Sequence, residues 1–257
     1  MFLLLSNRMP FFDSFFSFFI DNFPPLSLIS WLFPLSIIWS FAALYIAGVC
    51  KKNLGWATGY SRKVFHFLIF ISALFYQQSY SVAGVFILGW SVSIVLLYSI
   101  FKGEGSLLYE AIAREKDAPH RTKYIVYSYV ATLLGGILSN FFLQPFAIFG
   151  YVVTGFADAI AEPIGTRFGN HPYRVLSLDK NKKSYRSMEG SIAVFVATFF
   201  SIYAVTYFTT TIHLNILYLA VVAFLCTLAE AVSPSGFDNF ILQIVTTFLC
   251  SFLFYYS

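Results

Sequence analysis

The stretch GFADAIAEPIGTRFGNHPYRV, from Gly155 to Val175, places two carboxylates in a run that is apolar enough to cross a bilayer. Asp158 and Glu162 are four residues apart, so a helix carries both on one side. Gly165 and Gly169 continue that side, and glycine lets a ligand or a neighbouring backbone approach closely. An ionisable residue within a membrane span is costly and by default indicates a functional site. The stretch therefore predicts a transmembrane helix that carries part of such a site.

The composition of the whole chain is that of an integral membrane protein. Hydrophobic residues make up 58% of the 257 residues and charged residues only 11%, with a mean hydropathy of +0.74. Soluble domains carry about a quarter charged residues, so a soluble fold is excluded. Cys50, Cys226 and Cys250 form neither a CxxC motif nor a Cys/His cluster, which argues against a zinc or disulfide framework. We expect a lipid bilayer as the environment and no nucleic-acid partner.

Windows of about 20 apolar residues predict eight transmembrane helices, with seven as the main alternative. The predicted spans are 26–49, 64–79, 82–101, 124–143, 146–167, 190–209, 213–232 and 238–256. Ahead of them, the phenylalanine-rich segment 11–23 predicts a short helix that lies in the membrane interface. The predicted fold is an all-α polytopic membrane bundle, with residues 1–25 as an interfacial leader and residues 26–257 as a single transmembrane domain.

The basic residues predict the orientation of this bundle. Three alternate loops, after the first, third and fifth predicted spans, hold all of the 16 Lys and Arg residues except Arg8. Alternate loops lie on one side of the membrane, and the positive-inside rule identifies that side as the cytoplasm. With eight spans, both termini face the opposite side.

Further polar residues are predicted at the same depth as Asp158 and Glu162. These residues lie at or near the cytoplasmic ends of other predicted spans. They are Arg62, Lys63, His66, Arg186, Glu189, Glu230, Asp238 and Asn239. Two carboxylates do not both stay charged in a low-dielectric pocket without compensation. Mg²⁺ compensates them well, because it takes one or two carboxylates together with substrate phosphates. The pattern predicts a metal–nucleotide site that opens toward the cytoplasm.

The same residues fall in blocks that resemble the CTP-dependent lipid-alcohol kinases, the family of dolichol kinase, phytol kinase and CTP-dependent diacylglycerol kinase. The blocks are RKVFH at 62–66, FADAIAEPIGTRFG at 156–169, RSMEGS at 186–191 and AEAVSPSGFDN at 229–239. AREKD at 113–117 resembles a weaker block of phytol kinases. The resemblance implies a multi-span catalytic domain that transfers the γ-phosphate of CTP to a lipid hydroxyl with Mg²⁺. Arg186 replaces the lysine that is usual in the third block.

The charge pattern and the resemblance together assign expected roles to the polar residues. The expected metal ligands are Asp158, Glu162 and Glu189. The expected nucleotide contacts are Arg62, Lys63, Gly165, Gly169, Lys182, Lys183, Arg186 and Asn239. The catalytic candidates, which include a base for the lipid hydroxyl, are His66, Asp158, Glu230 and Asp238.

Several of these residues also have a purely structural interpretation. His66 suits an interfacial histidine hydrogen-bonded to a carbonyl, and Asp238 suits an N-cap. Gly165 and Gly169 suit close helix packing. Two other functions stay open: a cytidylyltransferase acting on a lipid phosphate, and an ion-coupled transporter. The chain lacks the KRxxxxKD and HGGxxDRxD blocks of phosphatidate cytidylyltransferases, and its acids crowd one interface instead of the midplane expected of a transporter.

Overall fold

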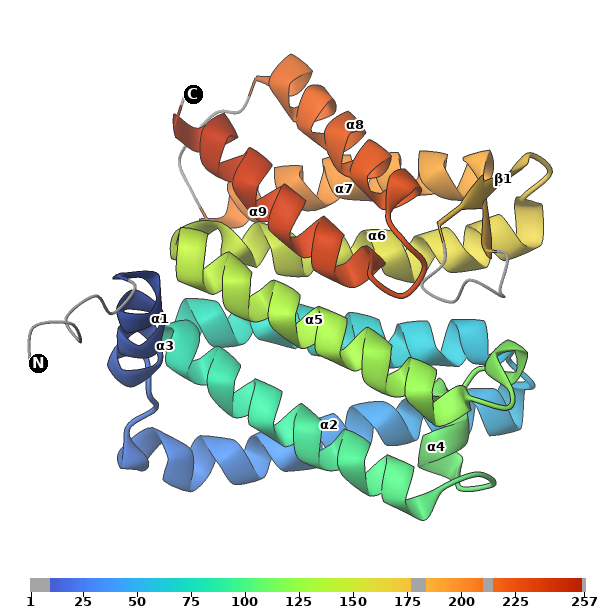
Figure 1. Ribbon diagram of the computed structural model, residues 1–257, viewed down its shortest axis with the longest axis horizontal. Coiled ribbons are helices and arrows are strands. Elements are labelled where there is room, and N and C mark those ends of the chain that lie inside the picture. Colours follow the sequence, from blue (N-terminus) through green and yellow to red (C-terminus); the bar gives the residue numbers. More distant parts are fainter. Residues whose placement is uncertain (1–9, 177–183, 210–214, 256–257) are drawn as a thin grey trace, which may run out of the picture.

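The computed structural model describes residues 10–176, 184–209 and 215–255 (Figure 1). The fold is a helical bundle, which confirms the all-α prediction, and every predicted span falls on a helix. The long helices are α2 (Leu26–Leu54), α3 (Thr58–Lys102), α5 (Arg121–Leu143), α6 (Ala147–Phe168), α7 (Met188–Thr209), α8 (Ile216–Val232) and α9 (Asp238–Tyr255). The helix α1 (Pro10–Asp21) precedes them.

The predicted spans 64–79 and 82–101 are the two arms of α3. The arms fold back on each other at Ser81, whose φ of 54° and ψ of −155° interrupt the helical backbone (Figure 1). By length and composition, four continuous helical stretches in the described part are apolar enough to cross a membrane. They are 26–54, 58–102, 121–168 and 188–209, and 216–232 and 238–254 are shorter apolar helices. These stretches indicate a membrane protein, while the number of eight spans stays a prediction.

Helix α6 is the centre of the bundle, because it packs against α3, α7 and α9. Small residues permit this close packing. At Gly155, a Cβ atom would lie only 2.6 Å from the Cβ of Phe70 on α3, so a larger residue would force the two helices apart. Val153 and Ala157 of the same helix are fully buried. The site-bearing stretch is therefore held in the middle of the fold.

Helix α1 covers the end of the bundle that lies opposite the β-hairpin and α4 (Figure 1). Its rings pack on α3 and α5. Phe15 and Phe18 meet Phe141 edge-to-face, with ring centroids 5.2 and 5.5 Å apart, and Phe19 stacks on Phe86 at 5.5 Å. Phe16 of the same helix is 66% exposed. The side of α1 that contacts the bundle is therefore the one that carries Phe15, Phe18 and Phe19.

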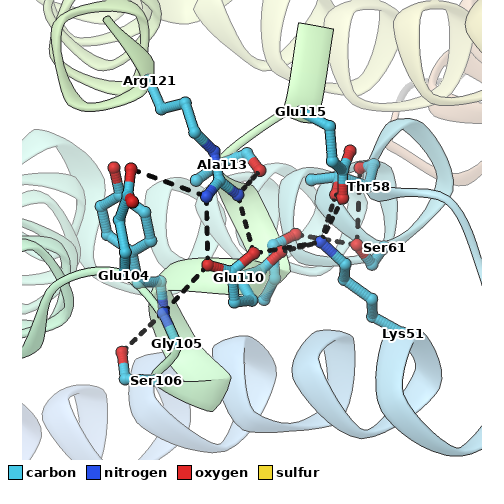
Figure 2. A network of polar contacts seen from close by, with 12 residues as sticks. Lys51, Thr58, Ser61, Glu104, Gly105, Ser106, Glu110, Ala113, Glu115 and Arg121 are labelled. Carbon is cyan, nitrogen blue, oxygen red and sulfur yellow. Dashed lines mark hydrogen bonds and ion pairs between the residues drawn. The ribbon is translucent and has the colours of Figure 1, made fainter. Parts of the chain in front are cut away.

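A strap, defined as residues 103–120, joins α3 to α5 and contains α4 (Leu107–Ile112) and the 3-10 turn η1 (Glu115–Asp117). Figure 2 shows Glu110 of the strap between the cationic groups of Lys51 and Arg121. Arg121 donates to both carboxylate oxygens of Glu110, at 3.1 and 2.7 Å, and to the carbonyl of Ala113 at 2.6 Å. Lys51 donates to the Glu110 carbonyl at 2.9 Å and to Glu115 at 2.6 Å. These bonds tie the strap to α2 and α5.

A β-hairpin follows α6, in a region that the sequence analysis described only as a basic loop. Strand β1 (Pro172–Val175) pairs antiparallel with β2 (Ser184–Ser187), and Tyr173 lies opposite Arg186. The loop prediction was wrong at these residues because backbone pairing across a long connection leaves little local signal in the sequence. The interruption between the predicted spans 213–232 and 238–256 is confirmed, since α8 ends at Val232 and α9 begins at Asp238.

We predict that Glu110→Gln destabilises the protein by about 2 kcal/mol, because it weakens charged hydrogen bonds from Arg121 and Lys51. The hydrogen bonds from Arg121 lower the pKa of Glu110 below its ordinary value of 4.5, so the carboxylate stabilises the fold above that pH. The difference between wild type and variant is therefore expected to shrink as the pH falls below 4.5. Thermal unfolding in detergent, followed at each pH by the circular dichroism of the helices, measures both effects.

Glu104→Gln is the matched control, because the Glu104 carboxylate lies 3.7 Å from the same arginine but is 67% exposed. An exposed pair of this kind contributes less than about 1 kcal/mol. Equal destabilisation by the two variants would contradict the structural role of the strap.

Candidate functional site

A polar cavity of about 280 Å³ lies at the end of the bundle that carries the strap and the hairpin. We call it the polar cavity. Its charged lining comes from α3, the strap, α6, β2, α8 and α9, and consists of Arg62, Lys63, Arg114, Lys116, Asp158, Glu162, Arg186, Glu230 and Asp238. Residues from all five sequence blocks therefore meet in one place, although they are spread over more than half of the chain.

The most buried contact of the cavity joins Lys63 to Asp158. Lys63 on α3 is 5% exposed, and its Nζ lies 2.5 Å from Asp158 Oδ1 on α6. The same Nζ lies 3.4 Å from Glu162 Oε2. Two charges at this depth are tolerated only as partners, because either one alone would lose its hydration without compensation. Lys63 thus contacts both members of the acid pair that the sequence placed one helical turn apart.

Arg62 and the strap complete the surroundings of Glu162. Arg62 Nη2 donates to Glu162 Oε2 at 2.9 Å, and its Nη1 lies 3.5 Å from Ser128 Oγ on α5. Lys116 of η1 approaches Glu162 Oε1 at 3.8 Å from a largely exposed position. Glu162 is thus the point where α3, α6 and the strap meet.

A second ionic cluster forms around Arg186 on β2. Its Nε lies 3.1 Å from Glu230 Oε1, and its Nη2 lies 3.4 Å from Asp238 Oδ2. Arg186 also donates to the Glu230 carbonyl and, at 3.1 Å, to Ser233 Oγ. One guanidinium therefore fixes the end of α8, the chain break and the start of α9 to the hairpin. This contact explains why the hairpin belongs to the site.

His66 lies between the polar cavity and a neighbouring, more apolar cavity. Its Nε2 lies 3.3 Å from Asp158 Oδ2 and 3.2 Å from the carbonyl oxygen of Thr154. Because a carbonyl oxygen only accepts hydrogen bonds, this contact assigns the ring proton to Nε2. Nδ1 is then the acceptor nitrogen of the ring. The structure thus contains the carbonyl contact expected of a structural histidine, and it also places the ring beside Asp158.

Gly165 and Gly169, from the FADAIAEPIGTRFG block, line the polar cavity and also permit close packing. A Cβ atom at Gly165 would lie 3.0 Å from Ser187 Oγ, and one at Gly169 would lie 2.8 Å from Ser187 Cβ. Both positions therefore let α6 approach the end of β2. The packing interpretation and the ligand-contact interpretation are both compatible with this geometry.

Five expected site residues are not among the described residues that line the polar cavity, namely His66, which lines the neighbouring apolar cavity, and Lys182, Lys183, Glu189 and Asn239. Glu189 pairs with the Nδ1 of His171 at 2.7 Å and is not among the lining residues. Asn239 borders the neighbouring apolar cavity instead, and its side-chain amide donates to Thr132 Oγ1 at 2.8 Å. Lys182 and Lys183 lie outside the described residues.

The carboxylates form no preassembled metal cage. Among the described residues, no three His, Cys, Asp or Glu side chains come together as ligands. The carboxylates of Asp158 and Glu162 lie near each other, because both contact Lys63 Nζ, and both already have basic partners. This arrangement fits a Mg²⁺ ion that enters with phosphates and takes most of its ligands from them and from water. It does not fit a metal held by Asp158, Glu162 and Glu189 together.

Sequence reasoning missed two cations of the cavity, Arg114 and Lys116. Both come from the AREKD block, which was noted for its resemblance but given no role. Counted over the described lining, five Lys and Arg residues face four acids, so the balance favours an anionic ligand. A cavity with paired acids, surplus cations and glycines is suited to hold a phosphate chain.

Comparisons of the chain with protein-family models, with curated proteins and with solved structures found no match. The sequence blocks and the geometry described above are therefore the basis for any functional assignment.

We predict that Lys63→Met destabilises the protein by about 3 kcal/mol, because it leaves the buried Asp158 without its nearest cation. Adding Asp158→Asn to this variant is expected to recover part of the loss, since the uncompensated charge disappears. Unfolding midpoints of the wild type, both single variants and the double variant give the coupling free energy. Strictly additive losses would show that the two side chains do not interact.

Proposed function

We propose that the protein is a membrane kinase that transfers the γ-phosphate of CTP to the hydroxyl of a lipid alcohol. The observation that carries this proposal is the convergence of the RKVFH, FADAIAEPIGTRFG, RSMEGS and AEAVSPSGFDN blocks on one polar cavity. These blocks are separated in sequence, and residues from each of them line the same space. The preference for CTP rests on the resemblance of the blocks, and the cytoplasmic orientation rests on the distribution of basic residues.

The charges of the cavity suit phosphoryl transfer. In this reaction the protein mainly positions the reactants and neutralises charge that develops on the phosphoryl oxygens. Arg62 and Arg114 reach the cavity from α3 and the strap, and Arg186 reaches it from the hairpin. Arginine presents several donors in a planar fork, which matches phosphate oxygens better than a single ammonium group does. We assign the phosphate contacts to these three arginines and to Lys63.

Asp158 and Glu162 are the residues that would hold Mg²⁺ beside the phosphates. When bound, the ion would supply positive charge to the transferred group. Lys63 and Arg62 orient both acids before a nucleotide enters, since each contacts at least one of the two carboxylates.

His66 is our first choice for the group that accepts the proton of the lipid hydroxyl. The Thr154 carbonyl and Asp158 hold Nε2, which leaves Nδ1 as the acceptor. Asp158 would also stabilise the positive charge on the ring after proton uptake. Glu230 and Asp238 are the alternatives from the sequence, but both are held by Arg186.

The decisive experiment incubates the purified protein with Mg²⁺, γ-labelled CTP and a panel of phytol, farnesol, polyprenol and diacylglycerol. We expect label to appear in an alcohol phosphate and CDP to accumulate. Asp158→Asn is expected to lower turnover by about 100-fold or more, because the residue contacts both the proposed metal and His66. The variant should stay folded, since Lys63 keeps Glu162 as a partner at 3.4 Å.

Glu104→Gln, on the exposed part of the strap, is the control variant and should retain wild-type turnover. Release of labelled pyrophosphate with a phosphatidate acceptor would instead identify a cytidylyltransferase. Normal turnover of a folded Asp158→Asn protein would refute the assigned role of Asp158.

A further inference from the structure

Two further cavities continue from the polar cavity into the bundle, and only the first of them adjoins it directly. The first, of about 110 Å³, shares Arg62 and Arg114 with the polar cavity, and we call it the junction cavity. The second, of about 460 Å³, is called the tail cavity. The residues that line both the junction and the tail cavity are Ile69, Phe70, Val92, Tyr129 and Thr132. The three cavities therefore adjoin one another in series, from the charged end of the bundle into its interior.

The tail cavity is suited to hydrocarbon. It lies between the two arms of α3 and α5, and Phe19 and Phe23 of the α1 region contribute to its wall. Among the described residues that line it, none is Asp, Glu, Lys or Arg. A cavity of this kind binds an apolar group without the cost of burying charge. Its ligand is thus expected to be a hydrocarbon chain.

Asn239 lines the junction cavity, and its side-chain oxygen is buried without a hydrogen-bond donor. Asn239 is 5% exposed, and its Oδ1 has no partner. The Thr132 hydroxyl donates its proton to the carbonyl of Ser128, so it can only accept a hydrogen bond from Asn239. This excludes the flipped orientation of the Asn239 amide, in which Oδ1 would face Thr132. Asn140 Oδ1 and Gln243 Oε1, from residues that line the tail cavity, also lack partners, so such atoms do not locate a hydroxyl by themselves. The hydroxyl is placed in the junction cavity by Arg62 and Arg114, which this cavity shares with the polar cavity.

We propose that the junction and tail cavities bind the alcohol acceptor as a single hydrocarbon chain, with its hydroxyl in the junction cavity near Arg62, His66 and Asn239. This inference rests on the proposed kinase function and names the class of acceptor. A diacylglycerol carries two chains that begin close to its hydroxyl, so both would have to start in the junction cavity. That cavity has about a quarter of the volume of the tail cavity, which favours one chain.

Gly89 on the second arm of α3 offers a direct test. It lines the tail cavity, and a Cβ atom there would meet only Leu133 Cδ1, at 4.0 Å. Gly89→Leu therefore fills the cavity without a backbone clash, and leucine also favours the helix. We expect kcat/KM for geranylgeraniol to fall roughly tenfold or more relative to that for geraniol. Gly89→Ala should have a much smaller effect, and Leu97→Phe, at a position that is 66% exposed on the same arm, should have none.

Binding is measured separately from turnover, so that the two proposals are tested independently. Geranylgeraniol with a photoreactive group at the end of its chain is cross-linked to the full-length protein in detergent. The labelled peptides are then mapped. We expect label on the second arm of α3 and on α5, competition by unmodified geranylgeraniol but not by dioleoylglycerol, and loss of the label in Gly89→Leu.

Each result supports or overturns the inference. Cross-linking in the tail cavity without phosphorylation by CTP would support the tail site and refute the kinase. Phosphorylation of geranylgeraniol with an unchanged chain-length profile in Gly89→Leu would overturn the tail site and leave the kinase standing. Equal competition by dioleoylglycerol would overturn the single-chain assignment.

Discussion

The buried ion pair between Lys63 and Asp158 is the contact on which the charged end of this bundle depends. It joins the beginning of α3 to the middle of the fold, where α6 packs against three other helices. Neither charge is tolerated alone at this depth, so the two helices must keep their relative rotation for the pair to persist. That rotation also fixes Arg62 beside Glu162 and His66 beside Asp158. One electrostatic constraint thereby arranges most of the cavity wall.

The other walls reach the cavity through segments that are not long helices. The strap is tied to α2 and α5 by Lys51 and Arg121, and it brings Arg114 and Lys116 to the opening. The hairpin brings Arg186, which fixes α8 and α9 at the same time. Short polar segments can therefore supply cations to the end of an apolar bundle without placing them among the helix interiors.

The proposed reaction requires a polar and an apolar binding site next to each other, and the adjacent cavities meet this requirement. A nucleotide comes from water and a lipid alcohol comes from the bilayer, so the two reactants require different surroundings. The arginines that line both the polar and the junction cavity, Arg62 and Arg114, stand where those surroundings meet. At the other end of the bundle, Phe19 of α1 lines the tail cavity and stacks on Phe86. Transfer between the reactants would take place at the boundary that Arg62 and Arg114 mark.

The sequence alone determined the membrane class, the positions of the helices and the side of α6 that carries Asp158 and Glu162. These features depend on local composition and on the helical period, which are legible in a single chain. Only the tertiary structure decided that Lys63 pairs with Asp158, that Glu189 turns to His171, and that Asn239 borders the apolar cavity. The pairing of the hairpin and the placement of the strap's cations in the cavity wall were likewise decided only by the tertiary structure. Such contacts depend on how each helix is rotated against its neighbours, and that rotation is set by the packing of all the helices together.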